Sequence, residues 1–207
     1  MPLVYQQNIN EHTRLGVWHI NESESFFLEK VPLQKSITHP HKRLQHLAGR
    51  LLLCEMFNDF PINLIQIAQT RKPFLEDDAF HFSISHCGHY AAAIVSRKNR
   101  VGVDVETIQP KIELIKNKFL TAQEQQLLLH QQDNPLQALT MAWSAKEALF
   151  KWYALGNVDF KKNLQIATVQ IHSHQYAFDC RFVKEHSIHL QVRGFVFNQL
   201  CLSWVVS

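Results

Sequence analysis

Three acidic residues have the spacing of ligands for one divalent cation. Asp104 and Glu106 are two positions apart in VGVDVE, and Glu147 lies in WSAKEALFK. On a strand, two such residues leave the same face with Cα atoms roughly 6.5–7 Å apart, and carboxylates that close repel unless a cation or proton lies between them. Gly102, on the same face, would leave room for a ligand near the backbone. The acids alone would also fit a solvated strand face.

A polar stripe follows one face of the helix expected around Glu147. Thr140, Ser144, Glu147 and Lys151 are spaced by four, three and four positions. Glu147 and Lys151 alone could be an ordinary surface ion pair worth about 0.3–0.5 kcal/mol. Lys146 instead falls within the apolar arc, where its amine would either extend to water or reach a ligand.

Basic residues earlier in the chain are suited to a phosphate group. Arg43, Arg50, Lys72 and His86 supply donors that can be charged, and Ser85 adds a hydroxyl. Oxygen ligands such as the three acids suit Mg²⁺, which completes its shell with water and phosphate oxygens. No Walker-type glycine loop is present, which disfavours that class of nucleoside triphosphatase. The residues therefore predict a Mg²⁺-dependent enzyme that acts on a phosphate ester.

The elements that must position these residues are a helix and several strands in the first half of the chain. Leucines recur every three or four positions over 39–57, which predicts a helix. Residues 80–85 alternate between apolar and polar side chains and predict a half-buried strand. Strands over 91–96 and 101–106, joined by a polar turn, are a hairpin candidate.

The second half combines helices with strands. Thr121 and Glu124 have the spacing of a capping box at a helix start. Strands and helices follow no regular βαβ order, so an α+β fold with antiparallel sheet is favoured. Helices are predicted over residues 111–118, 121–132 and 135–154, and strands over 164–206.

Composition excludes several classes of protein. Apolar residues make up 46% of the 207 residues and charged residues 19%, which argues against disorder. The net charge of +3 is too small to indicate a nucleic-acid partner. No apolar run is long enough to cross a bilayer, and the first residues lack the pattern of a secretory signal. The four cysteines form no CxxC pair and are expected to be reduced. We expect a cytoplasmic protein.

Five ordered segments resemble the 4'-phosphopantetheinyl transferases of the double-length type, which activates peptide synthetases and other carrier-dependent systems. These segments are RKPF (71–74), SISHCG (83–88), VGVDVE (101–106), FLTAQE (119–124) and WSAKEALFK (143–151). The resemblance implies two similar α/β halves with antiparallel sheets, 1–102 and 103–207, related by pseudo-twofold symmetry, with the active site between them.

The resemblance also implies a reaction. Coenzyme A would donate its 4'-phosphopantetheine arm to a serine of an apo acyl or peptidyl carrier protein, releasing adenosine 3',5'-bisphosphate. Asp104, Glu106 and Glu147 would hold Mg²⁺ on the diphosphate, and Glu147 would help to deprotonate the serine. Lys151 would stabilise charge on the diphosphate and assist the leaving group, so that Asp104 and Lys151 also lie at coenzyme A.

The same resemblance assigns the basic residues to the nucleotide part of coenzyme A. Ser85 and His86 would bind phosphate, with His86 near the 3'-phosphate, and Lys72 would contact the nucleotide end. Arg43 and Arg50 are further phosphate contacts.

The partner and two alternative functions stay open at this point. Lys111, Lys116 and Lys118 either dock an acidic carrier helix or form a solvated helix face. The carrier could belong to a fatty-acid, polyketide, peptide-synthetase or siderophore system, and a monomer is expected. One alternative is a non-catalytic module that binds coenzyme A or the carrier. Another is a different Mg²⁺-dependent enzyme that acts on pyrophosphate esters.

Overall fold

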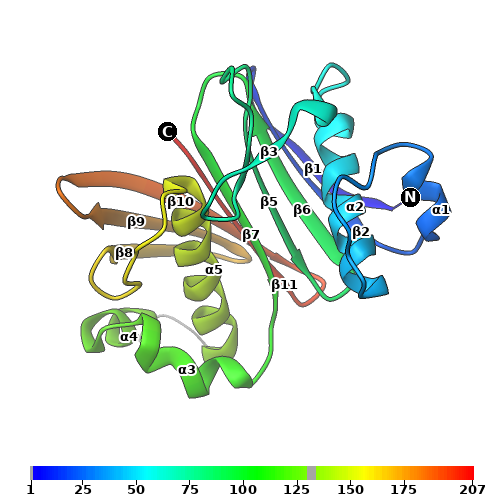
Figure 1. Ribbon diagram of the computed structural model, residues 1–207. Helices are drawn as coiled ribbons and strands as arrows, with labels where there is room; N and C mark the ends of the chain where they lie inside the picture. Colours follow the sequence, from blue (N-terminus) through cyan, green and yellow to red (C-terminus); the bar gives the residue numbers. More distant parts are fainter. Residues whose placement is uncertain (1, 130–133) are drawn as a thin grey trace. The chain divides into compact units, whose positions relative to one another are not determined.

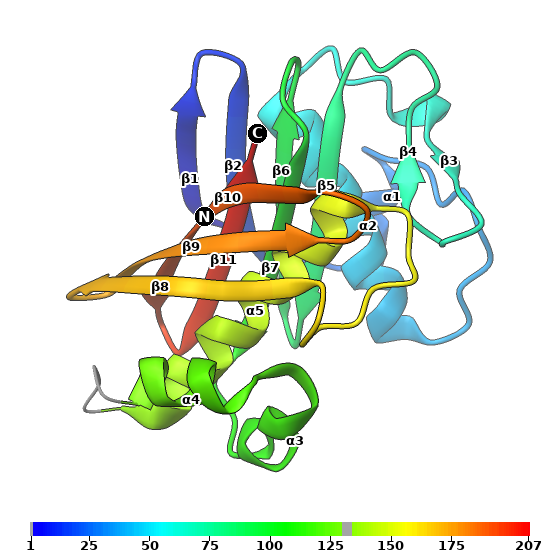
Figure 2. The ribbon, with the colours of Figure 1, turned by 90° about the vertical axis from the view of Figure 1, so that its left-hand side faces the viewer.

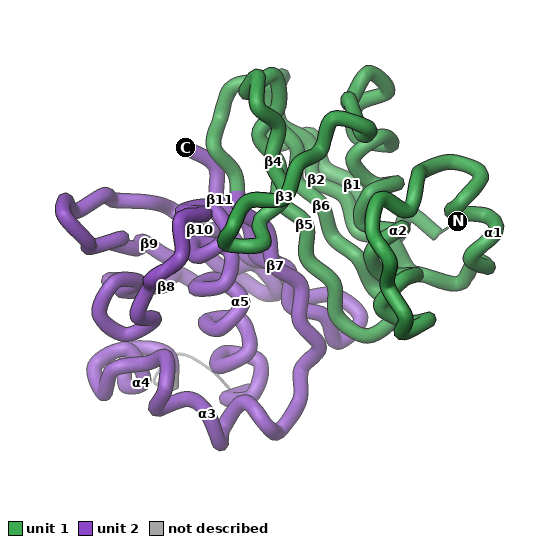
Figure 3. The backbone as a smooth tube through the Cα atoms, in the orientation of Figure 1, with its two compact units in different colours: residues 1–101 green, residues 102–207 purple. Residues whose placement is uncertain are grey.

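The computed structural model describes residues 2–129 and 134–207. The chain divides into two compact units, residues 1–101 and 102–207, shown in different colours in Figure 3. Each unit contains a hydrophobic core of its own. Helices and antiparallel strand pairs occur in both units, which confirms the α+β expectation.

Unit 1 is a four-stranded sheet with one long helix, α2 (Pro40–Met56), packed on it (Figure 1). Helix α2 begins with a proline in its first turn and ends where Phe57 turns extended. The helix predicted from leucine spacing is confirmed, and Leu47 and Leu51 of that spacing are buried. In sheet order the strands are β1 (Leu3–Asn10), β2 (Thr13–His19), β6 (Tyr90–Ser96) and β5 (His81–Cys87), and all neighbours are antiparallel.

Short elements complete unit 1. They are α1 (Glu24–Leu28), the 3₁₀ helix η1 (Ile62–Leu64), and the two-residue strands β3 (Gln66–Ile67) and β4 (Pro73–Phe74), which pair with each other.

The predicted hairpin between residues 91–96 and 101–106 is wrong. Strand β6 pairs with β5 through the turn at Gly88, whose φ of 52° suits glycine. Strand β7 (Val101–Thr107) instead joins the sheet of the second unit. The polar turn at 97–100 therefore connects two sheets. Strand β5 was expected to have one polar, exposed face. Ser83 and Ser85 on that face are buried, as is Phe82 on the other face, so the expected half-buried pattern does not hold there.

Unit 2 is a five-stranded sheet with α5 (Pro135–Tyr153) packed mainly on its strands β11 and β10 (Figure 2). The strand order is β7, β11 (Leu200–Val206), β10 (Ser187–Phe197), β9 (Gln175–Val183) and β8 (Leu164–His172). These strands confirm the prediction for residues 164–206.

Two shorter helices, α3 (Lys111–Phe119) and α4 (Ala122–Leu129), precede α5. The capping box is confirmed, because Thr121 N donates to Glu124 Oε2 (2.7 Å) and Glu124 N donates to Thr121 Oγ1 (3.2 Å). Residues 130–132 of the predicted helix lie outside the described residues. None of the described helices is long and apolar enough to cross a membrane.

Candidate active site

Strand β7 and helix α5 approach each other unusually closely, and this contact positions the acidic residues. A Cβ on Gly102 would overlap the carbonyl oxygen of Ala148 and crowd the amide of Trp152. Ser144 Oγ donates to the Asp104 carbonyl oxygen (3.3 Å) within the same interface. The sequence interpretation of Gly102 is therefore wrong: its missing side chain admits the backbone of α5 rather than a ligand.

Asp104 forms an ion pair with Lys151. Lys151 Nζ lies 2.6 Å from Asp104 Oδ1, and the Asp104 residue is only 2% exposed. A buried carboxylate is costly unless a positive charge and hydrogen bonds compensate it. Lys151 supplies that charge from α5, and about a quarter of its own side chain stays accessible (24%).

Glu106 is held by Trp143, a residue of the WSAKEALFK segment that was not among the predicted site residues. Trp143 Nε1 donates to Glu106 Oε1 (3.2 Å). The indole stacks on Phe160 at a centroid distance of 5.3 Å and meets the edge of Phe119 at 5.1 Å. These aromatic contacts fix the orientation of the N–H donor. A tryptophan one turn before a predicted ligand was the signal available in the sequence.

Glu147 lies within electrostatic reach of both other acids. Burial, followed by the negative charge of Asp104, raises the pKa of Glu147 to about 7; Lys151 opposes this shift and Glu106 adds to it. The two other carboxylates thus disfavour the ionisation of Glu147, and a nearby cation would counteract this repulsion.

The acids do not converge on a complete metal site. Across residues 2–129 and 134–207, no three His, Cys, Asp or Glu side chains are gathered so as to hold a metal ion by themselves. One oxygen of Asp104 engages Lys151, and one oxygen of Glu106 engages Trp143. Mg²⁺ commonly uses only one or two carboxylates, with waters and phosphate oxygens as further ligands. The chemistry of these residues therefore fits a cation shared with a phosphate-containing substrate.

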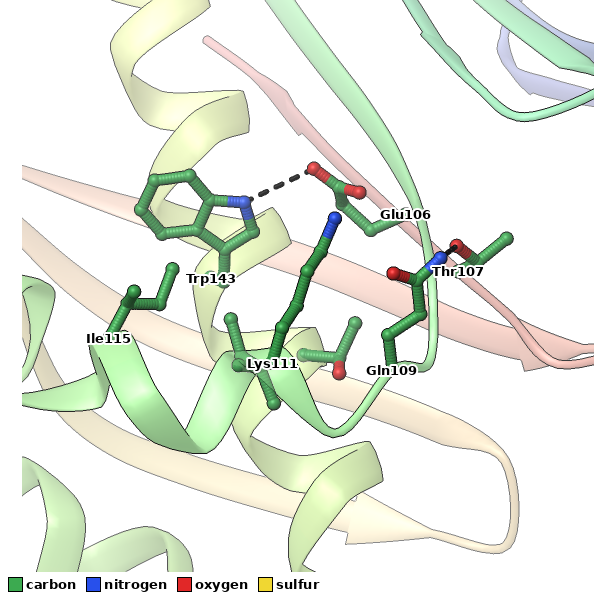
Figure 4. A pocket seen from close by; sticks show the side chains of 8 residues that line it. Glu106, Thr107, Gln109, Lys111, Ile115 and Trp143 are labelled. Carbon is green, nitrogen blue, oxygen red and sulfur yellow. Dashed lines mark hydrogen bonds between the residues drawn. The ribbon is translucent and has the colours of Figure 1, made fainter.

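A pocket of about 190 Å³ opens beside Glu106 (Figure 4). Trp143 and Ile115 provide an apolar wall, and Gln109 and Lys111 provide polar groups. Figure 4 shows the Lys111 side chain extending toward the Glu106 carboxylate. A ligand in this pocket would have access to Glu106.

Lys146 neither extends to water nor faces a ligand, contrary to both sequence interpretations. It is fully buried (0%) and donates to Glu124 Oε1 (2.7 Å), to the Phe119 carbonyl (2.7 Å) and to the Phe160 carbonyl (3.0 Å). Glu124 also accepts the backbone N–H of Ile166 (2.8 Å). Lys146 thus bonds to the backbone carbonyls of Phe119 and Phe160, the two aromatic residues that contact Trp143.

The basic residues predicted in unit 1 lie on several elements. Arg43 on α2 pairs with Glu24, with Nε 2.7 Å from Oε1, and its Nη1 donates to the Ile37 carbonyl (2.9 Å). Arg50, two turns later, is only 4% exposed. The two arginines therefore share a helix but have different environments.

The remaining predicted contacts of unit 1 lie on β5 and just before β4. Ser85 is buried (5%) and His86, the next residue of β5, is exposed. Burial, followed by the charge of Arg100, lowers the pKa of Lys72 to about 8. A nearby anion would favour the charged form of this lysine.

The family model described as "4'-phosphopantetheinyl transferase superfamily" matches residues 100–205. The chain belongs to this superfamily. The matched region contains the acids of β7 and α5, together with Lys151.

Several curated relatives are similar to this 4'-phosphopantetheinyl transferase superfamily member. Enterobactin synthase component D of Salmonella austin is 33% identical over 114 residues, which cover 55% of this chain and 48% of the relative. The protein of the same name from Escherichia coli (strain K12) is 34% identical over 117 residues, covering 53% and 54%. The 4'-phosphopantetheinyl transferase AcpT of Salmonella typhi is 27% identical over 113 residues, covering 53% and 58%. The matches thus span about half the length of these relatives.

Proposed function

We propose that the protein transfers the 4'-phosphopantetheine group of coenzyme A to a serine of an acyl or peptidyl carrier protein. The observation that carries this proposal is the joint placement of Asp104, Glu106, Glu147 and Lys151 on two packed elements of the region matched by the family model. The family and the names of the relatives support the reaction class.

In the proposed reaction, the serine oxygen forms a bond to the phosphorus of the phosphopantetheine group. The bond from that phosphorus to the leaving oxygen breaks, and adenosine 3',5'-bisphosphate departs. Asp104, Glu106 and Glu147 would hold Mg²⁺ together with the diphosphate. Bound there, the ion would neutralise phosphate charge and polarise the diphosphate.

Glu147 and Lys151 carry the proton and charge steps of the proposal. A carboxylate with a pKa near neutrality can take the serine proton as the new bond forms. Lys151 already neutralises Asp104, and it reaches solvent with part of its side chain. In the proposed reaction its ammonium group stabilises the diphosphate and the departing bisphosphate.

The basic residues of unit 1 are proposed to bind the nucleotide part of coenzyme A. Lys72, Ser85 and His86 supply donors from β5 and from the segment before β4, and Arg43 and Arg50 supply two guanidinium groups from α2. Phosphates accept several such hydrogen bonds at once.

Helix α3 is proposed to dock the carrier. Lys111 and Lys118 are exposed, Lys116 is partly exposed, and Leu114 between them is 84% exposed. A basic helix face with one apolar side chain complements an acidic partner with an apolar contact. Exchange of all three lysines for glutamate should raise the KM for carrier at least about tenfold. An unchanged KM would remove α3 from the docking surface.

The central experiment incubates several apo carriers with the protein, coenzyme A and Mg²⁺, and measures intact carrier mass. A gain of one phosphopantetheine group is expected with at least one carrier. Glu147→Gln should abolish the gain, whereas the matched exposed variant Glu185→Gln should retain it. Absence of any gain with every carrier, despite measurable coenzyme A binding, would favour the non-catalytic binding module instead.

We propose further that the protein works as a cytoplasmic monomer built from two related halves. Each unit combines an antiparallel sheet with one long helix, which supports the relation between the halves. Analytical ultracentrifugation with and without coenzyme A tests the monomer, and cell fractionation tests the location.

A further inference from the structure

Arg50 is a buried cation whose hydrogen-bond partners are neutral. The residue is 4% exposed on helix α2. Its Nη2 donates to Gln34 Oε1 (3.2 Å), and its Nη1 lies 3.3 Å from His46 Nδ1. Its Nε has no hydrogen-bond partner in the described part of the chain. A buried guanidinium without a carboxylate partner is costly, so the surroundings favour the arrival of an anion.

The contact with Arg50 determines which nitrogen of His46 carries the proton. A guanidinium can only donate, so Nδ1 of His46 must accept and has no hydrogen. The proton of the neutral imidazole then lies on Nε2. That atom is buried and also has no hydrogen-bond partner among the residues described. The pair therefore presents two buried donors, Arg50 Nε–H and His46 Nε2–H, that lack acceptors.

Electrostatics support this protonation state. Burial, followed by the positive charges of Arg50, Lys35 and His86, lowers the pKa of His46 to about 4. His46 is therefore neutral near pH 7, as the hydrogen bond to Nδ1 requires. The basic side chains that lower this pKa come from three segments: Lys35 from the loop before α2, Arg50 from α2 and His86 from β5.

We propose that His46 and Arg50 form a phosphate-binding site in unit 1, in which His46 donates its Nε2–H and Gln34 holds the acceptor position until the phosphate arrives. Gln34 is exposed and presents an uncharged amide oxygen to Arg50. Its other contact is the donation from Nε2 to the Ile62 carbonyl (3.0 Å). A phosphate oxygen can take over the Nη2–H bond and make it stronger, since a charged acceptor binds a guanidinium better than an amide does.

This inference rests on the proposed function, because it adds His46 to the residues that would hold the phosphates of coenzyme A and gives Gln34 the place that the phosphate would take. Two phosphate sources are chemically equivalent at this level, the 3'-phosphate and the diphosphate. Inorganic phosphate serves as a probe that depends on neither.

The test compares the binding of coenzyme A, 3'-dephospho-coenzyme A and inorganic phosphate by isothermal titration calorimetry. Gln34→Glu places a carboxylate beside Arg50 and should weaken coenzyme A binding about tenfold or more, because an internal anion then occupies the acceptor position. His46→Ala removes one donor and should weaken binding by a similar factor. The exposed control His189→Ala should bind within about twofold of wild type.

The ligand comparison identifies the phosphate. If the losses disappear with 3'-dephospho-coenzyme A, the site takes the 3'-phosphate; if they persist, it takes the diphosphate. Unchanged binding of coenzyme A and phosphate by both Gln34→Glu and His46→Ala would overturn the proposal. Gln34 is exposed, so Gln34→Glu remains informative even if His46→Ala fails to fold.

The outcome is separable from that of the proposed function. Phosphate binding that depends on His46 in a protein without transferase activity would leave this site standing and remove the reaction. Normal transfer by the wild type, with unaltered ligand binding by Gln34→Glu and His46→Ala, would leave the reaction standing and remove this phosphate site.

Discussion

At the scale of single residues, Asp104 and Lys151 illustrate how one pair can serve stability and chemistry. The carboxylate is buried, so Lys151 compensates a charge that would otherwise oppose folding. In the proposed reaction, the Asp104 carboxylate and the Lys151 ammonium also interact with coenzyme A. The same exchange of partners is inferred for Arg50, whose neutral acceptor Gln34 would give way to phosphate.

Replacement of Lys151 by methionine should affect both properties. It leaves Asp104 buried without its cation, so the free energy of unfolding should fall by about 2–4 kcal/mol in urea titrations. Phosphopantetheine transfer should fall at least about 100-fold, because charge on the diphosphate is no longer stabilised. Lys98→Met, at an exposed position, is the control and should change neither quantity. Near-native transfer by Lys151→Met would exclude its proposed role.

His46 should make the protein sensitive to mild acid. Its pKa is lowered from 6.5 to about 4 in the folded state by burial and by Arg50, Lys35 and His86. The unfolded chain therefore binds more protons between these values, and stability should decrease as pH falls from about 6.5 to about 4. Chemical unfolding of wild type and His46→Leu at several pH values measures this. The variant should show a shallower decrease, and equal slopes would contradict the assignment.

Spacing and the family resemblance together predicted that three acids and one lysine lie near one another, as the Asp104–Lys151 pair and the electrostatics of Glu147 show. Asp104, Glu106, Glu147 and Lys151 follow from strand and helix periodicity combined with the family resemblance. The partners Trp143 and His46 could not be predicted in the same way, because their roles depend on contacts between side chains from different elements.

At the scale of elements, the contact between β7 and α5 is the feature on which the site depends. Gly102 allows the backbone of the strand to meet the backbone of the helix, and Ser144 bonds across the same interface. Two residues along β7, Asp104 then lies within reach of Lys151. The spacing of these two elements therefore determines the geometry of the ion pair.

Gly102→Ala should separate the strand from the helix. Its Cβ would overlap the Ala148 carbonyl, so unfolding free energy should decrease by about 2–3 kcal/mol and transfer should fall with it. Gly88→Ala is a matched control: Gly88 has a φ of 52° with open space around it, and the cost there should be only about 1 kcal/mol. Equal effects of the two substitutions in thermal unfolding would show that the close contact is unimportant.

Local signals predicted most helices and strands but failed where pairing is non-local. The capping box at Thr121 and the leucine spacing of α2 are properties of neighbouring residues, so they are readable in the sequence. Strand β7 pairs with β11, which lies almost a hundred residues later in the chain. A local turn between neighbouring strands cannot predict such a distant pairing. Lys146 was misjudged for the same reason, since its partners come from α3, from α4 and from the turn at Phe160.

At the scale of the whole molecule, the two units contribute different chemistry to the proposed reaction. Unit 2 contains all three acids and Lys151, and it accounts for nearly all of the region matched by the family model. Unit 1 contains the basic residues proposed to hold the nucleotide. Substitutions in the two units should therefore change different kinetic constants.

Steady-state kinetics of two variants tests this division. Lys72→Ala in unit 1 should raise the KM for coenzyme A about tenfold and leave kcat within about threefold, since it removes binding shared by ground state and transition state. Glu106→Gln in unit 2 should lower kcat at least about 100-fold. The reverse pattern, with Lys72→Ala acting mainly on kcat, would assign both units to the chemical step.

Helix α5 ends three residues after Lys151 with Ala154 in a left-handed conformation (φ 74°, ψ −23°), a geometry that glycine adopts at lower cost. The last turn, closed by the bond from Ala154 N–H to the Phe150 carbonyl, should therefore open more often than the turns before it. Each opening would release Lys151 from its fixed direction. Ala154→Gly should slow amide hydrogen exchange in this turn about fivefold, and unchanged exchange would show that the cap does not limit the opening. The lysine of the ion pair would thus be held by a turn that opens readily, which would give it freedom to move with the phosphate that it is proposed to contact.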